Sequence, residues 1–302
     1  MAADCIRIFN RYTGKYEKEL VYGEAFLRLA YGTAVGRWST WALVSRPFFS
    51  RLFGWRMRQR GTAGKVLPFI SKYGLDAGEF AKPPDSYHCF NDFFCRELKP
   101  GARPVDRRPE AIVFPADGRH SGWQEIGSEE GVFVKGQHWE LGPLLEKSVE
   151  RPERFEGGTL VLSRLCPTDY HHFHFPVSGL LCHRHWMGRH LYSVSPFALR
   201  KNLAYLWANK RCLTRIDAGS LGEVLFIEVG ATNVGSIRHR PVGMGDRIEK
   251  GEPAGWFEFG GSSLLTIFER GKVSLSDDLA AHSREGIELY AHMGDVMGRI
   301  TA

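Results

Sequence analysis

The segment FGGSS at residues 259–263 has a composition that could break its own backbone. The two glycines before Ser262 allow backbone conformations that a residue with a Cβ resists. An activated Ser262 hydroxyl could attack the carbonyl carbon of Gly261 and turn the amide into an ester. β-Elimination would then cut the chain and leave a pyruvoyl group. The alternative is structural, because most Gly-Gly-Ser segments are only hairpins or bulges.

This reaction needs a base beside the hydroxyl and a carboxylate that orients the base, as in Ser-His-Asp sites. The sequence offers Asp117 in PADG and three histidines, His171, His172 and His174, in TDYHHFHFPVSG. Each has a simpler interpretation when taken alone. Asp117 could be a turn residue, and any one histidine could be a buried structural side chain.

The histidines also suggest zinc, since His172 and His174 would share one face if HFHFP is a strand. No convincing third ligand accompanies them at the usual spacing, and His183, His185 and His190 are too unspecific for that role. We therefore predict no metal. A Walker loop and the motifs GxGxxG, HExxH and GxSxG are absent from the sequence.

The sequence pattern changes from helical to strand-like near residue 105, which predicts an α+β fold. Helical patterns at 62–80, ended by Gly74, and at 90–98 precede it. From Ala111, short apolar runs alternate with turn residues, as in strands and hairpins. The spacing of glycines in VGMGDRIEKGEPAGWFEF resembles lipoyl-type barrel-sandwich domains, although the setting of Lys250 does not suit a carrier lysine. We predict a helical region, 1–105, and a β-rich catalytic domain, 106–302.

Residues 25–75 contain nine Lys or Arg, ten aromatic residues and no Asp or Glu, in a chain with a net charge of +6. This composition is typical of helices that lie in a membrane interface. Helices packed on the protein's own core, or an arm that binds nucleic acid, are the alternatives. The sequence contains neither an apolar run of the roughly 20 residues that cross a bilayer nor a secretory signal. The six cysteines form no CxxC pair and are expected to be reduced.

Several of these segments together resemble the phosphatidylserine decarboxylases, which are pyruvoyl-dependent enzymes. The matching segments occur in the family's order over about residues 60–300 and are FNDFFCRELKPGARPV (90–105), FPADG (114–118), PTDYHHFHFPVSG (167–179), VGATNVGSI (229–237) and KGEPAGWFEFGGSSLLTIFERGKV (250–273). The Gly-Ser-Ser of this chain replaces the Gly-Ser-Thr of many members.

The resemblance implies a role for each matching residue. Ser262 corresponds to the serine that becomes the pyruvoyl group, and Gly261–Ser262 to the bond that is cleaved. Asp117 and His174 correspond to the other members of the self-cleavage triad. His171 corresponds to a histidine near the substrate during decarboxylation, although the extra histidine, His172, leaves room for another alignment.

The resemblance also implies conversion of phosphatidylserine to phosphatidylethanolamine through a Schiff base with the covalent pyruvoyl group. Self-cleavage would give a β chain, 1–261, and an α chain, 262–302, which stay together as a heterodimer; further homo-oligomerisation is left open. We expect a peripheral protein on the cytoplasmic side of the cell membrane that binds an anionic lipid surface and no nucleic acid. A conventional serine hydrolase, an inactive membrane-binding scaffold and a decarboxylase of a soluble amino acid are the alternative functions.

Overall fold

The computed structural model describes residues 6–19, 52, 54–127, 137–146, 148–231, 237–259 and 262–301. We call residues 25–75 the basic aromatic segment; its residues 25–51 and 53 lie outside the described residues, as do residues 20–24. The predicted helices there are therefore not tested. Gly260 and Gly261, on the amino side of the predicted cleavage bond, also lie outside them.

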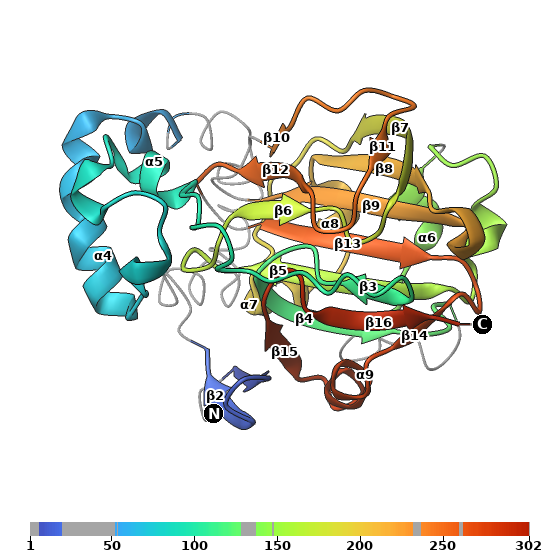
Figure 1. The fold of residues 1–302 in the computed structure, drawn as a ribbon. Coiled ribbons are helices and arrows are strands. Elements are labelled where there is room, and N and C mark those ends of the chain that lie inside the picture. Colours follow the sequence, from blue (N-terminus) through green and yellow to red (C-terminus); the bar gives the residue numbers. More distant parts are fainter. Residues whose placement is uncertain are drawn as a thin grey trace.

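A ten-stranded sheet forms the centre of the molecule (Figure 1). Its neighbouring strands pair antiparallel, except for the parallel pair β1 and β15. In spatial order the strands are β11 (Arg247–Ile248), β7 (Gly179–Met187), β8 (Arg211–Asp217), β9 (Glu223–Gly230), β13 (Ser262–Phe268), β5 (Thr159–Leu165), β4 (Gly118–Trp123), β15 (Glu288–Ala291), β1 (Arg7–Asn10) and β2 (Lys15–Lys18).

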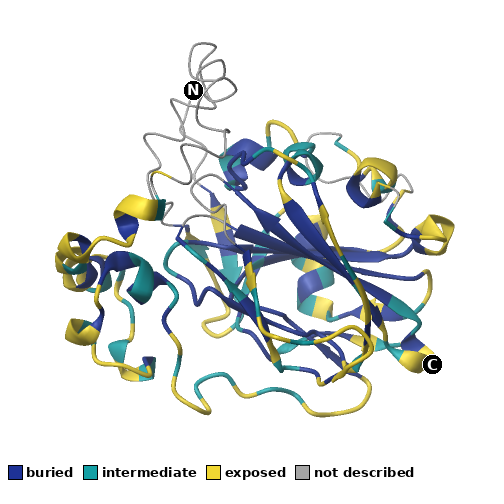
Figure 2. Cartoon of the chain, turned by 90° about the horizontal axis from the view of Figure 1, so that it is seen from above, coloured by how far each residue is buried: buried dark blue, intermediate teal, exposed yellow. Residues whose placement is uncertain are grey.

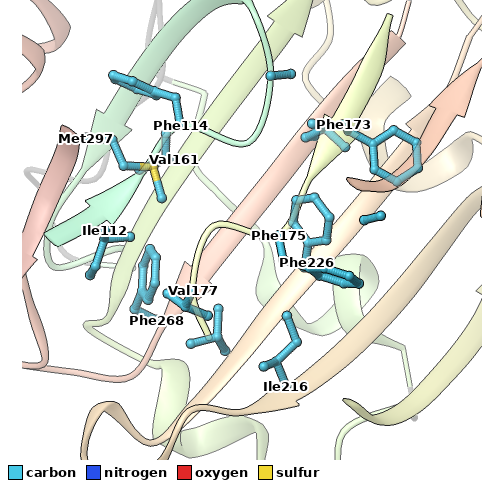
Figure 3. Packing of buried hydrophobic residues seen from close by; sticks show 14 of the residues in the cluster. Ile112, Phe114, Val161, Phe173, Phe175, Val177, Ile216, Phe226, Phe268 and Met297 are labelled. Atoms are coloured by element: carbon cyan, nitrogen blue, oxygen red, sulfur yellow. The ribbon is translucent and has the colours of Figure 1, made fainter. Parts of the chain in front are cut away.

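Two three-stranded sheets cover one face of the large sheet. One contains β10 (Ile237–His239), β12 (Pro253–Phe257) and β6 (His172–His174), and the other contains β14 (Val273–Leu275), β16 (Val296–Ile300) and β3 (Ala111–Val113). A buried apolar cluster fills the space between these layers. Figure 3 shows Phe173, Ile112 and Met297 of the small sheets in this cluster with Phe226 and Phe268 of the large one.

Short helices cover the opposite face of the large sheet. They are α6 (Leu141–Leu145), α7 (Pro196–Leu199) and α8 (Tyr205–Ala208), together with the 3₁₀ turn η6 (Pro152–Phe155). Their apolar side chains join those of Leu162, Leu225 and Ile267 in a second core. The 3₁₀ turn η7 (Gly219–Leu221), at the β8–β9 connection, instead places Leu221 in the first core. The residues of β5, β9 and β13 are almost all buried, because both faces of these strands are covered, and apolar side chains therefore occur on both faces.

A separate helical unit lies between β2 and β3 in the sequence. It contains η2 (Arg60–Lys65), α4 (Val66–Tyr73), η3 (Ala77–Glu79), η4 (Pro84–Ser86) and α5 (Phe90–Phe94). The prediction of a helix that ends at Gly74 is confirmed, since Gly74 has φ +62° and caps α4. The helix predicted over 90–98 ends earlier, at Phe94. Figure 2 shows more exposed surface on this unit than in the sheets.

The described N-terminal residues form a hairpin that the sequence analysis did not predict. Strand β1 pairs with β15 and extends the large sheet, and Arg11 forms an ion pair with Asp278 of α9 (Asp277–Arg284). The fold is α+β and rich in strands, as predicted. The barrel-sandwich likeness and the division near residue 105 stay predictions.

The predicted α chain is interleaved with the rest of the molecule. Strand β13 lies between β9 and β5 in the large sheet, β15 pairs with β4 and β1, and β16 pairs with β3. Cutting the backbone before Ser262 would therefore leave these strand pairs in place. Within the described part of the chain, no helix combines the length and apolarity needed to cross a membrane.

Candidate active site

Ser262 is the first residue of β13, an interior strand of the ten-stranded sheet. It pairs with Leu165 on one side and with Gly230 on the other, so its backbone is held from both sides. Its side chain is completely buried, yet Oγ has no hydrogen-bond partner among the described residues. An unsatisfied buried hydroxyl costs about 1–3 kcal/mol. A group of this kind is expected where the side chain has a chemical task.

Strand alternation decides which layer Ser262 faces. Leu264 and Phe268, at even positions of β13, belong to the core under the two small sheets, and Ser262 shares their face. The predicted histidines lie on the covering layer, in and beside β6. The structure thus places the serine and the histidines on facing layers.

His174 has the tautomer that a general base requires. Its Nδ1 lies 2.9 Å from the carbonyl oxygen of Gly251. A carbonyl only accepts, so Nδ1 carries the hydrogen and Nε2 of the neutral ring keeps its lone pair. This Nε2 is buried without a hydrogen-bond partner in the described structure. Burial lowers the pKa of His174 to about 4, against the opposing hydrogen bond to Gly251.

His171 is completely buried beside the helical unit. Its Nδ1 lies 3.0 Å from the carbonyl oxygen of Asp169, and its ring packs on Phe94 of α5 with centroids 3.8 Å apart. The backbone carbonyl of His171 also accepts the amide hydrogen of Phe257, at 2.9 Å. His171 is therefore fixed between α5 and the end of β12.

Asp117 lies just before β4 and is held mainly by an arginine. Arg103 Nε donates to both carboxylate oxygens, at 3.0 and 2.8 Å, and the amide of Met293 donates to Oδ1 at 2.9 Å. The hydrogen bonds of Asp117 and of His174 Nδ1 thus go to different partners. The two residues are nevertheless neighbours, because the amide of His174 donates to the carbonyl of Pro115 and the charge of Asp117 acts on the pKa of His174.

A pocket of about 380 Å³ opens beside Asp117. Arg96, Arg103 and Arg119 line it together with carboxylates that include Asp117 and Asp169. Arg96 is 4% exposed, and its Nε and Nη1 have no hydrogen-bond partner among the described residues. Guanidinium nitrogens of this kind suit an anionic group.

Other candidates from the sequence have structural roles or stay untested. Lys250 is buried, and its Nζ donates to the carbonyls of Arg108 and Ala111, which does not suit a carrier lysine. His183 and His185 stack on each other on β7. Residues 232–236 of VGATNVGSI lie outside the described part of the chain.

Among the described residues, one mixed group could hold a metal ion, and it is not the histidine cluster of the sequence analysis. Ligand atoms of Cys212, Glu228 and His239 lie within 4.8 Å of one another between β8, β9 and β10. Burial raises the pKa of the Cys212 thiol, so without an ion it is neutral. Glu228 Oε2 and His239 Nε2 are 3.4 Å apart, the distance of an ion pair when the ring is protonated.

Three contributors to this site were missed by sequence reasoning: the carbonyl of Gly251, the guanidinium of Arg103 and the side chain of Asn91. Arg103 and Asn91 both lie in the segment 90–105, which was recognised only as part of a pattern. No sequence rule states that a PGARP arginine pairs with the aspartate of PADG, because their contact depends on the fold.

The fold and the site define a strand-rich α+β protein with a buried set of serine, histidine and carboxylate side chains. The sequence profile of phosphatidylserine decarboxylase matches residues 90–298. Two curated relatives, both phosphatidylserine decarboxylase proenzymes, are from Ruminiclostridium cellulolyticum, with 37% identity over 97% of each chain, and Clostridium kluyveri, with 36% identity over 97% of this chain and 98% of the relative. A third proenzyme, from Chlamydia trachomatis, is 35% identical over 99% of both chains. The chain belongs to the phosphatidylserine decarboxylase family.

Proposed function

We propose that this chain cleaves itself between Gly261 and Ser262 and then converts phosphatidylserine to phosphatidylethanolamine. Membership of the family, whose curated relatives are named proenzymes, supports the reaction and the maturation. The observation that carries the site assignment is the buried Ser262 hydroxyl, which has no hydrogen-bond partner among the described residues. The products of cleavage are the β chain, 1–261, and the α chain, 262–302.

In the proposed cleavage, Ser262 is the nucleophile and His174 the base. The lone pair on His174 Nε2 takes the proton of the Ser262 hydroxyl as Oγ bonds to the carbonyl carbon of Gly261. The C–N bond breaks, and the proton passes to the departing nitrogen, which leaves an ester and a free amine. Asp117 supplies a negative charge that stabilises the protonated ring of His174.

The second half of the maturation removes the ester. Loss of the α-proton of Ser262 breaks its Cβ–Oγ bond, which releases the carboxylate of Gly261 and leaves dehydroalanine. Rearrangement to the imine and hydrolysis then release ammonia and leave the pyruvoyl group at the start of the α chain. The buried position of Ser262, at the start of an interior strand and on the face that the small sheets cover, fits this group.

The pyruvoyl group supplies a ketone that reacts with the substrate amine and accepts the electrons left when CO₂ departs. His171, fixed against Phe94, is the proposed histidine beside the substrate. The complete burial of Ser262 and His171 limits water at the carbanion stage. A ring of this kind can also hold or deliver a proton there.

We further propose that the protein is peripheral on the cytoplasmic side of the cell membrane. The described end of the basic aromatic segment supports this, because Leu52 and Trp55 are 50% and 58% exposed and Leu67 is 58% exposed. Exposed apolar side chains beside arginines are typical of an interface with anionic lipid. We also propose, from the spacing of glycines in VGMGDRIEKGEPAGWFEF, that the β-rich part has a lipoyl-like arrangement.

Intact mass measured under denaturing conditions tests the proposal. We expect two species that correspond to residues 1–261 and 262–302, the smaller one blocked to Edman degradation. Ser262→Ala should remain one chain and release no CO₂ from phosphatidylserine, because it has no hydroxyl to attack Gly261. Under native conditions the two pieces should migrate together, since β13, β15 and β16 pair with strands of the β chain.

A single unprocessed species with full activity would refute the proposal. Treating the native protein with borohydride in the presence of the substrate amine, before the mass is measured, separates a decarboxylase from a serine hydrolase. A decarboxylase of this kind becomes covalently linked to the amine on the smaller chain. A hydrolase that uses the Ser262 hydroxyl does not, because it presents no ketone.

A further inference from the structure

The chain passes from one sheet to another immediately before Ser262. Strand β12 ends at Phe257 in a three-stranded sheet, and β13 begins at Ser262 in the ten-stranded sheet. Only residues 258–261 connect them, and the last two of these are glycines. The proposed cleavage bond therefore lies at the end of a short connection between layers, and its geometry depends on how both ends are held.

The helical unit holds the first end of this connection at Phe259. The amide of Phe259 donates to Asn91 Oδ1 at 2.9 Å, and its ring packs edge to face on Phe90 and Phe94, with centroids 5.3 and 4.9 Å apart. Phe259 is 3% exposed and lies in the apolar cluster of the helical unit. Helix α5 thus contacts the chain two residues ahead of Gly261.

Helix α5 is itself fixed before it contacts Phe259. The amide of Phe90 donates to Thr62 Oγ1 at 2.9 Å, and Cys89 Sγ accepts from the amide of Asp92 at 3.4 Å. The ring of Phe93 is completely buried in the same apolar cluster. Asn91 therefore projects from a helix with a defined position.

The same helix contacts the histidine segment. Phe94 packs on the ring of His171, the carbonyl of Cys95 lies 3.0 Å from His172 Nε2, and Cys95 Sγ lies 3.5 Å from the carbonyl of Phe257. The short helix α5 and the residue after it therefore contact both the chain before the cleavage bond and the histidine segment, and fix their relative positions. Figure 1 shows the helical unit at the end of the molecule where β6 and β12 lie.

We propose that Asn91 is a positioning residue for self-cleavage, which holds Phe259 so that the carbonyl of Gly261 meets the Ser262 hydroxyl. This role rests on the proposed self-cleavage at Gly261–Ser262. It adds that the helical unit, far away in the sequence, controls how fast the chain matures.

The physical reason is the freedom of the two glycines. Ser262 is held by β5 and β9, but a Gly-Gly link has more backbone conformations than any other dipeptide. An acyl shift needs the nucleophile about 3–3.5 Å from the carbonyl carbon, and a misplacement of about 1 Å can cost about 100-fold in rate. The hydrogen bond from Phe259 to Asn91 restricts the link from its other end.

Pulse–chase during cell-free synthesis of the full chain measures the conversion of one chain into two. We expect Asn91→Ala to cleave at least about tenfold more slowly than the unaltered chain. Asn91→Asp retains a side-chain oxygen that accepts from the Phe259 amide and should cleave within about threefold of the unaltered rate.

Asp92→Ala is the matched control in the same helix. Asp92 Oδ2 accepts from the amide of His88, so this change removes a helix contact without touching Phe259. We expect Asp92→Ala to cleave normally. Unaltered cleavage in a folded Asn91→Ala chain, or equal slowing in Asp92→Ala, would overturn the role of Asn91. Circular dichroism and the Tm of each uncleaved chain show that it has folded.

Hydroxylamine identifies the step that Asn91 controls. It attacks an ester, giving a hydroxamate on Gly261 and restoring the Ser262 hydroxyl, but it leaves amides intact. If Asn91 positions the acyl shift, hydroxylamine should not accelerate cleavage of Asn91→Ala. Restoration of the unaltered rate would show that the ester forms normally and would refute the positioning role. If the unaltered chain never cleaves, the proposed function fails instead, so the two failures are distinguishable.

Discussion

At the scale of single residues, burial and tertiary contacts give Ser262 and His174 the states that the proposed self-cleavage needs. Ser262 loses water on folding and gains no hydrogen bond within the described structure, and His174 loses water but keeps one bond through Nδ1. Desolvation disfavours the charged imidazolium, so the ring stays neutral at physiological pH. A neutral ring with a lone pair on Nε2 can accept a proton.

The lowered pKa of His174 predicts how self-cleavage depends on pH. With a pKa of about 4, the base is neutral above that value, so the cleavage rate should be constant from pH 8 to 5 and fall by half near pH 4. Pulse–chase in buffers across this range, with circular dichroism of the same samples, is the measurement. A midpoint near the unperturbed 6.5 would contradict a buried base whose pKa is lowered by desolvation.

At the scale of elements, steric contact with β5 explains why a glycine follows Asp117 in PADG. A Cβ on Gly118 would lie 2.6 Å from the carbonyl oxygen of Arg164, which is closer than real Cβ contacts allow. Gly118 therefore lets β4 approach β5 at the point where Asp117 ends the preceding turn. The motif combines a carboxylate with the glycine that allows its strand to pair.

Gly118→Ala should lower the free energy of unfolding by about 1–3 kcal/mol, because β4 must move away from β5. It should also slow self-cleavage, since Asp117 moves with the strand. Urea unfolding of uncleaved chains that also carry Ser262→Ala measures the first effect. Gly61→Ala is the matched control, because nothing lies within 4 Å of its Cβ position; an equal loss of stability there would contradict the steric explanation.

At the scale of the whole molecule, exposed apolar side chains occur both near the helical unit and on the sheets. Trp55 belongs to the basic aromatic segment, whereas Trp186 lies on β7, and the two are 58% and 44% exposed. Comparing the two residues shows whether membrane binding depends on any exposed tryptophan or on a tryptophan at the position of Trp55.

If the helical unit meets the membrane, Trp55→Ala should weaken binding to vesicles with anionic lipid by roughly tenfold, because an indole ring no longer enters the interface. Trp186→Ala should bind as the unaltered protein does. Vesicle sedimentation at low and high salt is the measurement, and salt should weaken binding in both cases. Equal effects of the two changes would argue against this orientation.

The sequence by itself identified the family and predicted a strand-rich α+β fold, and it supplied the candidate residue types and the order of their segments. These features depend on local chemistry and spacing, which the sequence displays directly. It also predicted the end of α4 at Gly74, because a left-handed glycine is a local feature.

Only the tertiary structure decided the partners. Gly251 orients His174, Arg103 holds Asp117, and Asn91 holds Phe259 across 168 positions of sequence. The N-terminal hairpin joins β15 at the other end of the chain for the same reason. Such contacts arise when layers pack, so they depend on the free energy of the whole fold rather than on any segment.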